Sequence, residues 1–190
     1  MSIDPAVLAE YLEALVPARP EEMVRMEATA RESNFPIIGP TAGYLCYQLT
    51  RLTGARTVFE LGSGYGYSTA WFAQAVRENG GGLVHHVVWD EELSGRPREH
   101  MKALGLADLV QFHVSEAVAA LSGQPGPFDL IFNDIDKQGY PASLPVIHDK
   151  LRSGGLLITD NALWQGKIFQ RDDKSPATEG VRELTRMLST

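Results

Sequence analysis

Short apolar runs alternate with helical patterns through the part of the chain that begins at Thr57. Runs rich in β-branched residues are typical of buried strands, and apolar residues three or four positions apart are typical of amphipathic helices. The predicted strand–helix pairs are 57–61 with 68–77, 83–89 with 96–104, 109–114 with 116–121, 128–133 with 142–151, and 156–159 with 178–188. Five strands that alternate with helices predict an α/β fold, a doubly wound and mainly parallel sheet with helices on both faces.

Further helical patterns precede the first strand. Asp4 and Pro5 are a typical N-cap and first helical residue, and they begin a predicted helix of about three turns. The other elements predicted here are the helices 21–32 and 41–52 and the turn-rich link 35–40. We interpret residues 1–55 as an N-terminal helical cap on a core of residues 56–190, both within one domain of residues 1–190. The first two helices are expected to form a solvated lid or a dimer contact.

A glycine-rich turn follows the first strand in the stretch TVFELGSGYGYSTA. Gly62, Gly64 and Gly66 permit positive φ and let a ligand approach the backbone closely. A strand, a glycine turn and a helix bind nucleotide-like cofactors at the mouth of a parallel sheet, and the free N–H groups of the helix start accept a carboxylate or phosphate. The same spacing occurs in dehydrogenases, in methyltransferases and in turns that bind nothing, so all three interpretations remain open at this point.

Polar residues follow the other four predicted strands. They are Asp90 after the second, Ser115 and Glu116 after the third, Asp134, Asp136 and Lys137 after the fourth, and Asp160 and Asn161 after the fifth. Ligands of doubly wound sheets bind outside the carboxyl ends of the strands, so we expect these groups to converge on one edge. A carboxylate at the tip of the second strand can accept both hydroxyls of a ribose, which suits Asp90.

The groups after the fourth and fifth strands are typical of a hard-cation site. Asp134, Asp160 and Asn161 offer only oxygen ligands, which suit Mg²⁺ or Ca²⁺ rather than zinc. Lys137 lies three residues after Asp134 and could act as a base in the same cleft, because a neighbouring divalent cation disfavours its ammonium form. The competing interpretation is that these polar residues cap helices or form Asx turns.

Composition excludes several classes of partner and site. The formal charge of −7 over 190 residues argues against a nucleic-acid partner or an anionic membrane surface. The single cysteine, Cys46, forms no disulfide framework, and no basic-then-apolar leader is present, so we expect a cytoplasmic protein. His85 and His86 are neighbours in a strand and face opposite sides, so they cannot chelate one ion together. The other three histidines, His100, His113 and His148, are expected to be isolated.

At this point the sequence resembles a known family. The stretches VFELGSGYGYS, AVAAL, FDLIFNDIDKQGY and LRSGGLLITDNALWQGK, in this order, resemble the cation-dependent O-methyltransferases, the group that includes catechol and caffeoyl-CoA O-methyltransferases. The resemblance runs from about Pro20 to the end. It implies a class I methyltransferase, Rossmann-like fold and S-adenosylmethionine (SAM) as cofactor. It also implies a divalent cation, Mg²⁺ or else Ca²⁺, and transfer of a methyl group to a hydroxyl of a small, catechol-like phenolic acceptor. We expect a homodimer.

The resemblance also assigns roles to individual residues. Those implied to bind the cofactor are Ile38, Glu60, Gly62, Ser68, Ser115, Glu116 and Asp134, with Asp90 as the ribose acid. The implied metal ligands are Asp134, Asp160 and Asn161. Lys137 would be the catalytic base, assisted by Asp134, and Trp164 would form a wall of the acceptor pocket.

Three features depart from the family pattern. The gap-free alignment puts Val88 where the family has its ribose acid, so Asp90 takes that role only through a shifted loop. Asn133 replaces an apolar residue before the first metal aspartate. The family also continues into a C-terminal strand hairpin beyond the fifth strand, which these residues lack. The alternatives to a methyltransferase are an NAD-type oxidoreductase, favoured by the glycine turn, and a non-catalytic relative that binds cofactor only.

Overall fold

A five-stranded parallel sheet in the order β3-β2-β1-β4-β5 forms the centre of the computed structural model, which describes residues 3–89 and 91–189. Its strands are β1 (Thr57–Leu61), β2 (Leu83–Val88), β3 (Val110–Val114), β4 (Phe128–Asn133) and β5 (Leu151–Thr159). The bounds predicted for β1 and β4 are confirmed. The sheet confirms the doubly wound α/β fold that the alternating pattern predicts.

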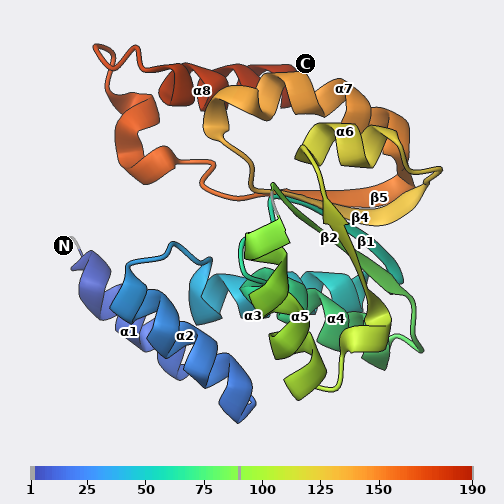
Figure 1. The fold of residues 1–190 in the computed structure, drawn as a ribbon. Coiled ribbons are helices and arrows are strands. Elements are labelled where there is room, and N and C mark those ends of the chain that lie inside the picture. Colours follow the sequence, from blue (N-terminus) through green and yellow to red (C-terminus); the bar gives the residue numbers. More distant parts are fainter. Residues whose placement is uncertain (1–2, 90, 190) are drawn as a thin grey trace.

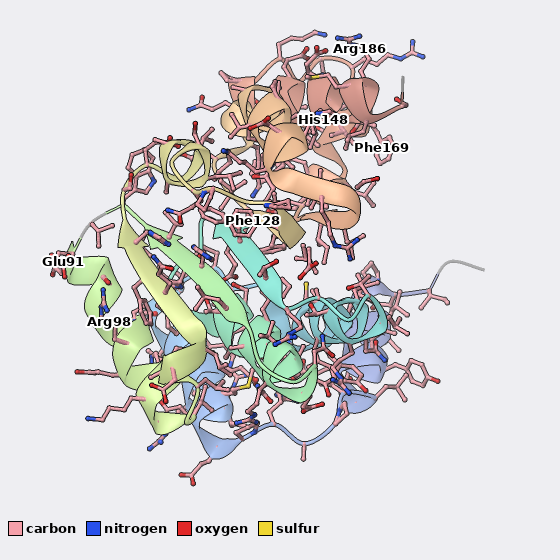
Figure 2. The ribbon with its side chains drawn as sticks, turned by 90° about the vertical axis from the view of Figure 1, so that its right-hand side faces the viewer. Glu91, Arg98, Phe128, His148, Phe169 and Arg186 are labelled. Carbon is pink, nitrogen blue, oxygen red and sulfur yellow. The ribbon has the colours of Figure 1, made fainter. Side chains whose placement is uncertain are left out.

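Helices cover both faces of this sheet. The layer below it in Figure 1 contains α3 (Gly39–Leu52), α4 (Tyr67–Glu78) and α5 (Glu91–Ala103), and α1 (Pro5–Ala14) and α2 (Glu21–Ser33) lie outside them. The layer above contains α6 (Ala117–Ser122), α7 (Tyr140–Lys150) and α8 (Pro176–Leu188). Three 3₁₀ turns complete the order, η1 (Ala107–Leu109), η2 (Lys137–Gly139) and η3 (Trp164–Phe169). In Figure 2, Phe128 on the sheet lies between the layer that carries Arg98 and the layer that carries His148 and Arg186.

Each face of the sheet has its own core. Phe72, Met101 and Phe132 are among the buried side chains on the side of α3 to α5, and Phe59 and Ile131 are among those on the side of α6 and α7. Within the described ranges, no helix combines the length and the apolar character that crossing a membrane requires.

Strand register places the two central turns next to each other. Leu61 pairs with Asn133, and Asn133 pairs in turn with Thr159, so Gly62, Asp134 and Asp160 each follow the end of their strand at the same edge. The Asp134 backbone N–H donates to the Leu61 carbonyl at 2.9 Å. The chain order reverses between β1 and β4, and this reversal is the point at which ligands bind in sheets of this class.

Two predicted element starts are wrong by five residues. β5 begins at Leu151 rather than at residue 156, because Leu151 pairs with Phe128 across a register irregularity that accommodates the intervening glycines. α5 begins at Glu91 rather than at residue 96 and continues through Pro97. The Pro97 ring packs over Gly66, and a Cβ there would lie 3.2 Å from the Pro97 Cβ, so tertiary packing supports a helix that local propensity disfavours.

Candidate active site

The turn between β1 and α4 is built around backbone conformations that favour glycine. Gly62, Gly64 and Gly66 have φ values of +84°, +49° and +95°. A Cβ on Gly62 would lie 2.7 Å from the Asp134 carbonyl oxygen, so the turns after β1 and β4 approach each other as closely as glycine allows. Ser68 follows in the first turn of α4 and is buried. This arrangement matches the predicted cofactor turn.

A segment between α2 and α3 lies over this turn. Its residues, Phe35–Ile38, run between two positive-φ residues, Asn34 and Gly39. The Phe35 ring packs edge-on against Tyr65 with 5.1 Å between ring centroids. The segment, the glycine turn, Ser68 and Asp134 line a cavity of about 40 Å³. Ile38 therefore lies beside the glycine turn, and its implied role of covering the cofactor stays a prediction.

Asp134 and Lys137 form an ion pair at this cavity. The Lys137 Nζ donates to Asp134 Oδ1 at 2.7 Å and to the Ile135 carbonyl at 3.2 Å. Lys137 is buried, and its Nζ lies 5.1 Å from the centroid of the Tyr140 ring. Burial raises the pKa of Asp134 to about 6, the Lys137 charge opposes that rise, and the Asp160 carboxylate adds to it.

Asp160 and Asn161 follow β5 beside this pair. The Asp160 backbone is held by two contacts: its N–H donates to the Asn133 carbonyl at 3.1 Å, and its carbonyl accepts from the Tyr140 hydroxyl at 2.9 Å. Asn161 is exposed and has a φ of +52°. Tyr140 is a site residue that sequence reasoning missed, because nothing in its spacing shows that its hydroxyl reaches two strand ends.

The donor chemistry of Asp134, Asp160 and Asn161 suits a hard cation. Asp134 is half-buried; burial is the main cause of the rise of its pKa, and the neighbouring Asp160 carboxylate adds a smaller repulsion that a cation would relieve. Across the described part of the chain, no three His, Cys, Asp or Glu side chains form a metal-binding group. The predicted trio contains only two carboxylates, with an amide as its third member.

Trp164 lies close to Lys137. The Lys137 Nζ is 5.9 Å from the centroid of the Trp164 ring. The Nζ of Lys167, which like Trp164 is on η3, is 5.3 Å from the same centroid. Trp164 and Gln165 have positive φ values of +45° and +53°, so the chain turns sharply here. The indole also packs against the buried cluster of Tyr140, Val181 and Leu184. Its predicted role as an acceptor wall stays a prediction.

The cofactor roles predicted for the residues after β2 and β3 stay predictions. Asp90 lies outside the described residues. Val88, the position to which the resemblance assigns the ribose acid, ends β2 as a buried side chain. Ser115 joins the two strand ends, because its N–H donates to the Val88 carbonyl at 2.9 Å. The Glu116 carboxylate caps α6 by accepting from the N–H groups of Val118 and Ala119 at 2.9 and 2.7 Å.

The prediction for the adjacent pair His85 and His86 is confirmed, whereas the prediction that the other histidines are isolated is wrong for two of them. His85 and His86 do face opposite sides of the sheet: His86 meets Thr69, whereas His85 stacks on His113, with 3.0 Å between Nδ1 and Nε2. The expectation that His113 is isolated is therefore wrong. It is also wrong for His100, whose Nδ1 lies 2.6 Å from Glu22. Parallel pairing of β2 with β3 and packing of α2 against α5 create these contacts.

Asn133, which replaces an apolar residue of the family pattern, has a partner in the helix above it. Its amide donates to the Ser143 hydroxyl on α7 at 3.0 Å, and that hydroxyl donates to the Tyr140 carbonyl at 2.8 Å. The polar side chain is therefore partly satisfied inside the core.

Known proteins resemble this chain over nearly its whole length. A sequence model described as "O-methyltransferase" matches residues 15–190. A catechol O-methyltransferase of Niastella koreensis is 28% identical over 184 residues, which cover 94% of this chain and 82% of the relative. A probable caffeoyl-CoA O-methyltransferase of Arabidopsis thaliana is 31% identical, again over 94% of this chain and 82% of the relative.

Solved structures agree with the sequence comparisons. The O-methyltransferase TomG of Streptomyces achromogenes, in complex with SAM, superposes with a TM-score of 0.86 at 26% identity over 96% of this chain and 84% of its own. An O-methyltransferase of Bacillus cereus, in complex with S-adenosylhomocysteine, has a TM-score of 0.87 at 25% identity over 96% and 85%. The expected Rossmann-like class I methyltransferase fold is confirmed. The chain therefore belongs to the O-methyltransferase family.

Proposed function

We propose that this protein transfers a methyl group from SAM to a hydroxyl of a catechol-like small molecule with the help of a divalent cation. The observation that carries the proposal is the Lys137–Asp134 pair, at 2.7 Å, on the cavity that the glycine turn lines. Family membership and the SAM and S-adenosylhomocysteine complexes of similar structures support SAM as the methyl donor. An NAD-type oxidoreductase has no such support.

The cofactor is proposed to lie over the glycine turn. Gly62 lets it approach the backbone, and the start of α4 at Ser68 offers free N–H groups to its carboxylate. Ile38 and its neighbours cover it from the other side. SAM supplies the methyl group through its sulfonium. The remaining adenosine contacts, at Ser115, Glu116 and Asp90, stay predictions.

The residues proposed to hold the cation are Asp134, Asp160 and Asn161. A divalent cation bound there would act as a Lewis acid toward the acceptor oxygen and would favour the uncharged amine of Lys137. Mg²⁺ suits the oxygen donors best, with Ca²⁺ as the alternative. As an uncharged amine, Lys137 would accept the phenolic proton at its Nζ, Asp134 would orient that amine, and Trp164 would bound the acceptor ring.

Substitution of Asp160 tests the division between cofactor and cation. We expect Asp160→Ala to abolish Mg²⁺-dependent methyl transfer to catechol while SAM binding, measured by calorimetry, stays within about threefold, because no cofactor contact is assigned to this residue. Asp172→Ala, which removes an exposed carboxylate elsewhere, is the matched control and should leave both unchanged. Equal loss of binding and transfer in Asp160→Ala would contradict the proposal. SAM binding by the wild type with no transfer to any simple catechol would indicate the non-catalytic relative.

We also propose a cytoplasmic homodimer that forms through α1. None of the residues of α1 is buried; Tyr11 within the helix is 62% exposed, and Leu15 at its C-terminal end is 61% exposed. A helix with this much exposed apolar surface favours a partner of the same kind. Light scattering would test it: Tyr11→Glu should give monomers, and a wild-type monomer at high concentration would refute the proposal.

A further inference from the structure

A buried network of three polar side chains lies behind the glycine turn and connects two strands and a helix. Glu60 is on β1, Thr69 is on α4 and His86 is on β2, and all three are completely buried. The Thr69 hydroxyl lies 2.5 Å from Glu60 Oε2 and 2.9 Å from His86 Nδ1. Burial raises the pKa of Glu60, and Ser63 and Ser68, which line the cavity, act together with Thr69 to oppose that rise.

The Thr69 hydroxyl has one hydrogen, which it can donate either to Glu60 or to His86. When Glu60 is a carboxylate, the Thr69 hydroxyl donates to Glu60 and accepts the Nδ1–H of His86. When Glu60 is protonated, its own O–H donates to Thr69, whose hydroxyl then donates to a bare Nδ1. The charge of Glu60 and the tautomer of His86 are therefore coupled, and the two states differ by one proton overall.

Two buried atoms at the ends of this Glu60–Thr69–His86 network carry no hydrogen bond from any residue that the structure describes. They are Glu60 Oε1 and His86 Nε2. Buried polar atoms without partners are rare, and a buried carboxylate is costly unless something compensates its charge. A cation in the cavity beyond the two serines would supply that compensation.

We propose that Thr69 and His86 are positioning residues that hold Glu60 as a carboxylate behind the cofactor seat, where its charge favours binding of the positively charged SAM. The inference rests on the proposed position of the cofactor over the glycine turn. It extends that proposal to two residues, one of them in the interior of β2, that touch neither the cofactor nor the acceptor.

The surrounding titratable groups are consistent with this role. Burial raises the pKa of Glu60 to about 7, and the Asp134 charge adds to the rise. Burial lowers the pKa of His86 to about 3, with Arg98 of α5 and His113 of β3 acting in the same direction, so this imidazole is neutral at physiological pH. Cys46 of α3 also faces Glu60, and burial raises the pKa of its thiol to about 12, so it stays uncharged.

Calorimetric titration with SAM between pH 6 and 8.5 tests the inference. A cation binds the carboxylate form better, so the affinity should rise about tenfold across this range, with a midpoint near the pKa of Glu60. Thr69→Val removes the donor to Glu60 at nearly constant volume and should move the midpoint upward by about one unit, weakening binding at pH 7 about tenfold. Thr69→Ser keeps the hydroxyl and should behave as the wild type.

The second pair of variants tests the contribution of His86. His86→Asn retains an N–H donor toward Thr69 and should leave the midpoint in place. His86→Leu removes the donor and should raise the midpoint, and combining it with Thr69→Val should shift the midpoint no further than Thr69→Val alone. This pair also carries the test if Thr69→Val fails to fold, which circular dichroism would reveal.

Two controls separate this inference from the proposed function. 5′-Methylthioadenosine has the adenosine but no positive charge, so its affinity should not change with pH. Carbon-13 spectra of the Glu60 carboxyl, assigned by its loss in Glu60→Gln, follow the same titration in the cofactor-free protein. Identical carboxyl midpoints in Thr69→Val and Thr69→Ser, or additive shifts in the double variant, would overturn the inference. A protein that binds no SAM at any pH would overturn the proposed function while the carboxyl titration still decided the coupling.

Discussion

Substitution of Gly62 by alanine would test whether the close approach of the two central turns determines the site. Gly62 has a φ of +84°, and a Cβ would lie 2.7 Å from the Asp134 carbonyl oxygen, closer than Cβ atoms come to such neighbours. Positive φ costs a residue with a side chain about 1–3 kcal/mol. Overpacking against backbone adds about 1–3 kcal/mol. Gly62→Ala should therefore lower the free energy of unfolding by about 4 kcal/mol.

Gly80 provides the matched control for this experiment. Its φ is +94°, close to that of Gly62, but no atom of the described residues lies within 4 Å of the position that a Cβ would take there. Gly80→Ala should thus carry the conformational cost alone, about 2 kcal/mol. Urea unfolding should separate the two variants by about 2 kcal/mol, and Gly62→Ala should also lose SAM affinity because Asp134 is displaced. Equal destabilisation of both variants would refute the reasoning.

Three further predictions concern charged groups. Lys137→Met should reduce methyl transfer at least about 100-fold, which is the scale of general-base catalysis, while SAM affinity is retained. Lys167→Met is the control: it also removes a cation beside the Trp164 ring and should leave methyl transfer unchanged. Glu60 has its pKa raised from 4.5 to about 7, so the wild type should lose about 3 kcal/mol of unfolding free energy as pH rises through that window, and Glu60→Gln should abolish this slope in urea titrations. Asp129 has its pKa lowered to about 2 by bonds from Arg56, Arg152 and Thr57, opposed by burial, so it stabilises the fold above about pH 4. This stabilisation should disappear as pH falls toward 2, and acid unfolding of Asp129→Asn should lack it.

The sequence could predict which residues lie together at the sheet edge where their position depends only on which strand they follow. Gly62, Asp134 and Asp160 each come directly after an apolar run, and the register of three parallel strands brings their backbones to one edge. Alternating strands and helices allow few other arrangements. Lys137 could be placed in the same cleft because the turn after β4 is short.

Contacts across the fold could not be predicted in this way. The bond from Thr69 to His86 joins residues 17 positions apart on different elements, and the hydroxyl of Tyr140 reaches Asp160 over 20 positions. Phe35 covers the glycine turn from a link whose sequence showed only that it turns. No local pattern reports which side chains a sheet and its covering helices will bring together.

The sequence by itself determined the parallel sheet, the glycine turn and the oxygen donors at its edge, because hydrophobic periodicity and strand order are properties of the chain. Only the tertiary structure decided how those groups are charged and held. Burial raises the pKa values of Glu60 and Asp134, and Lys137 meets Asp134 at hydrogen-bonding distance only after the β4 and η2 backbone has turned. Charge states depend on the distances and the loss of water that packing creates, and these come from every element that surrounds the site.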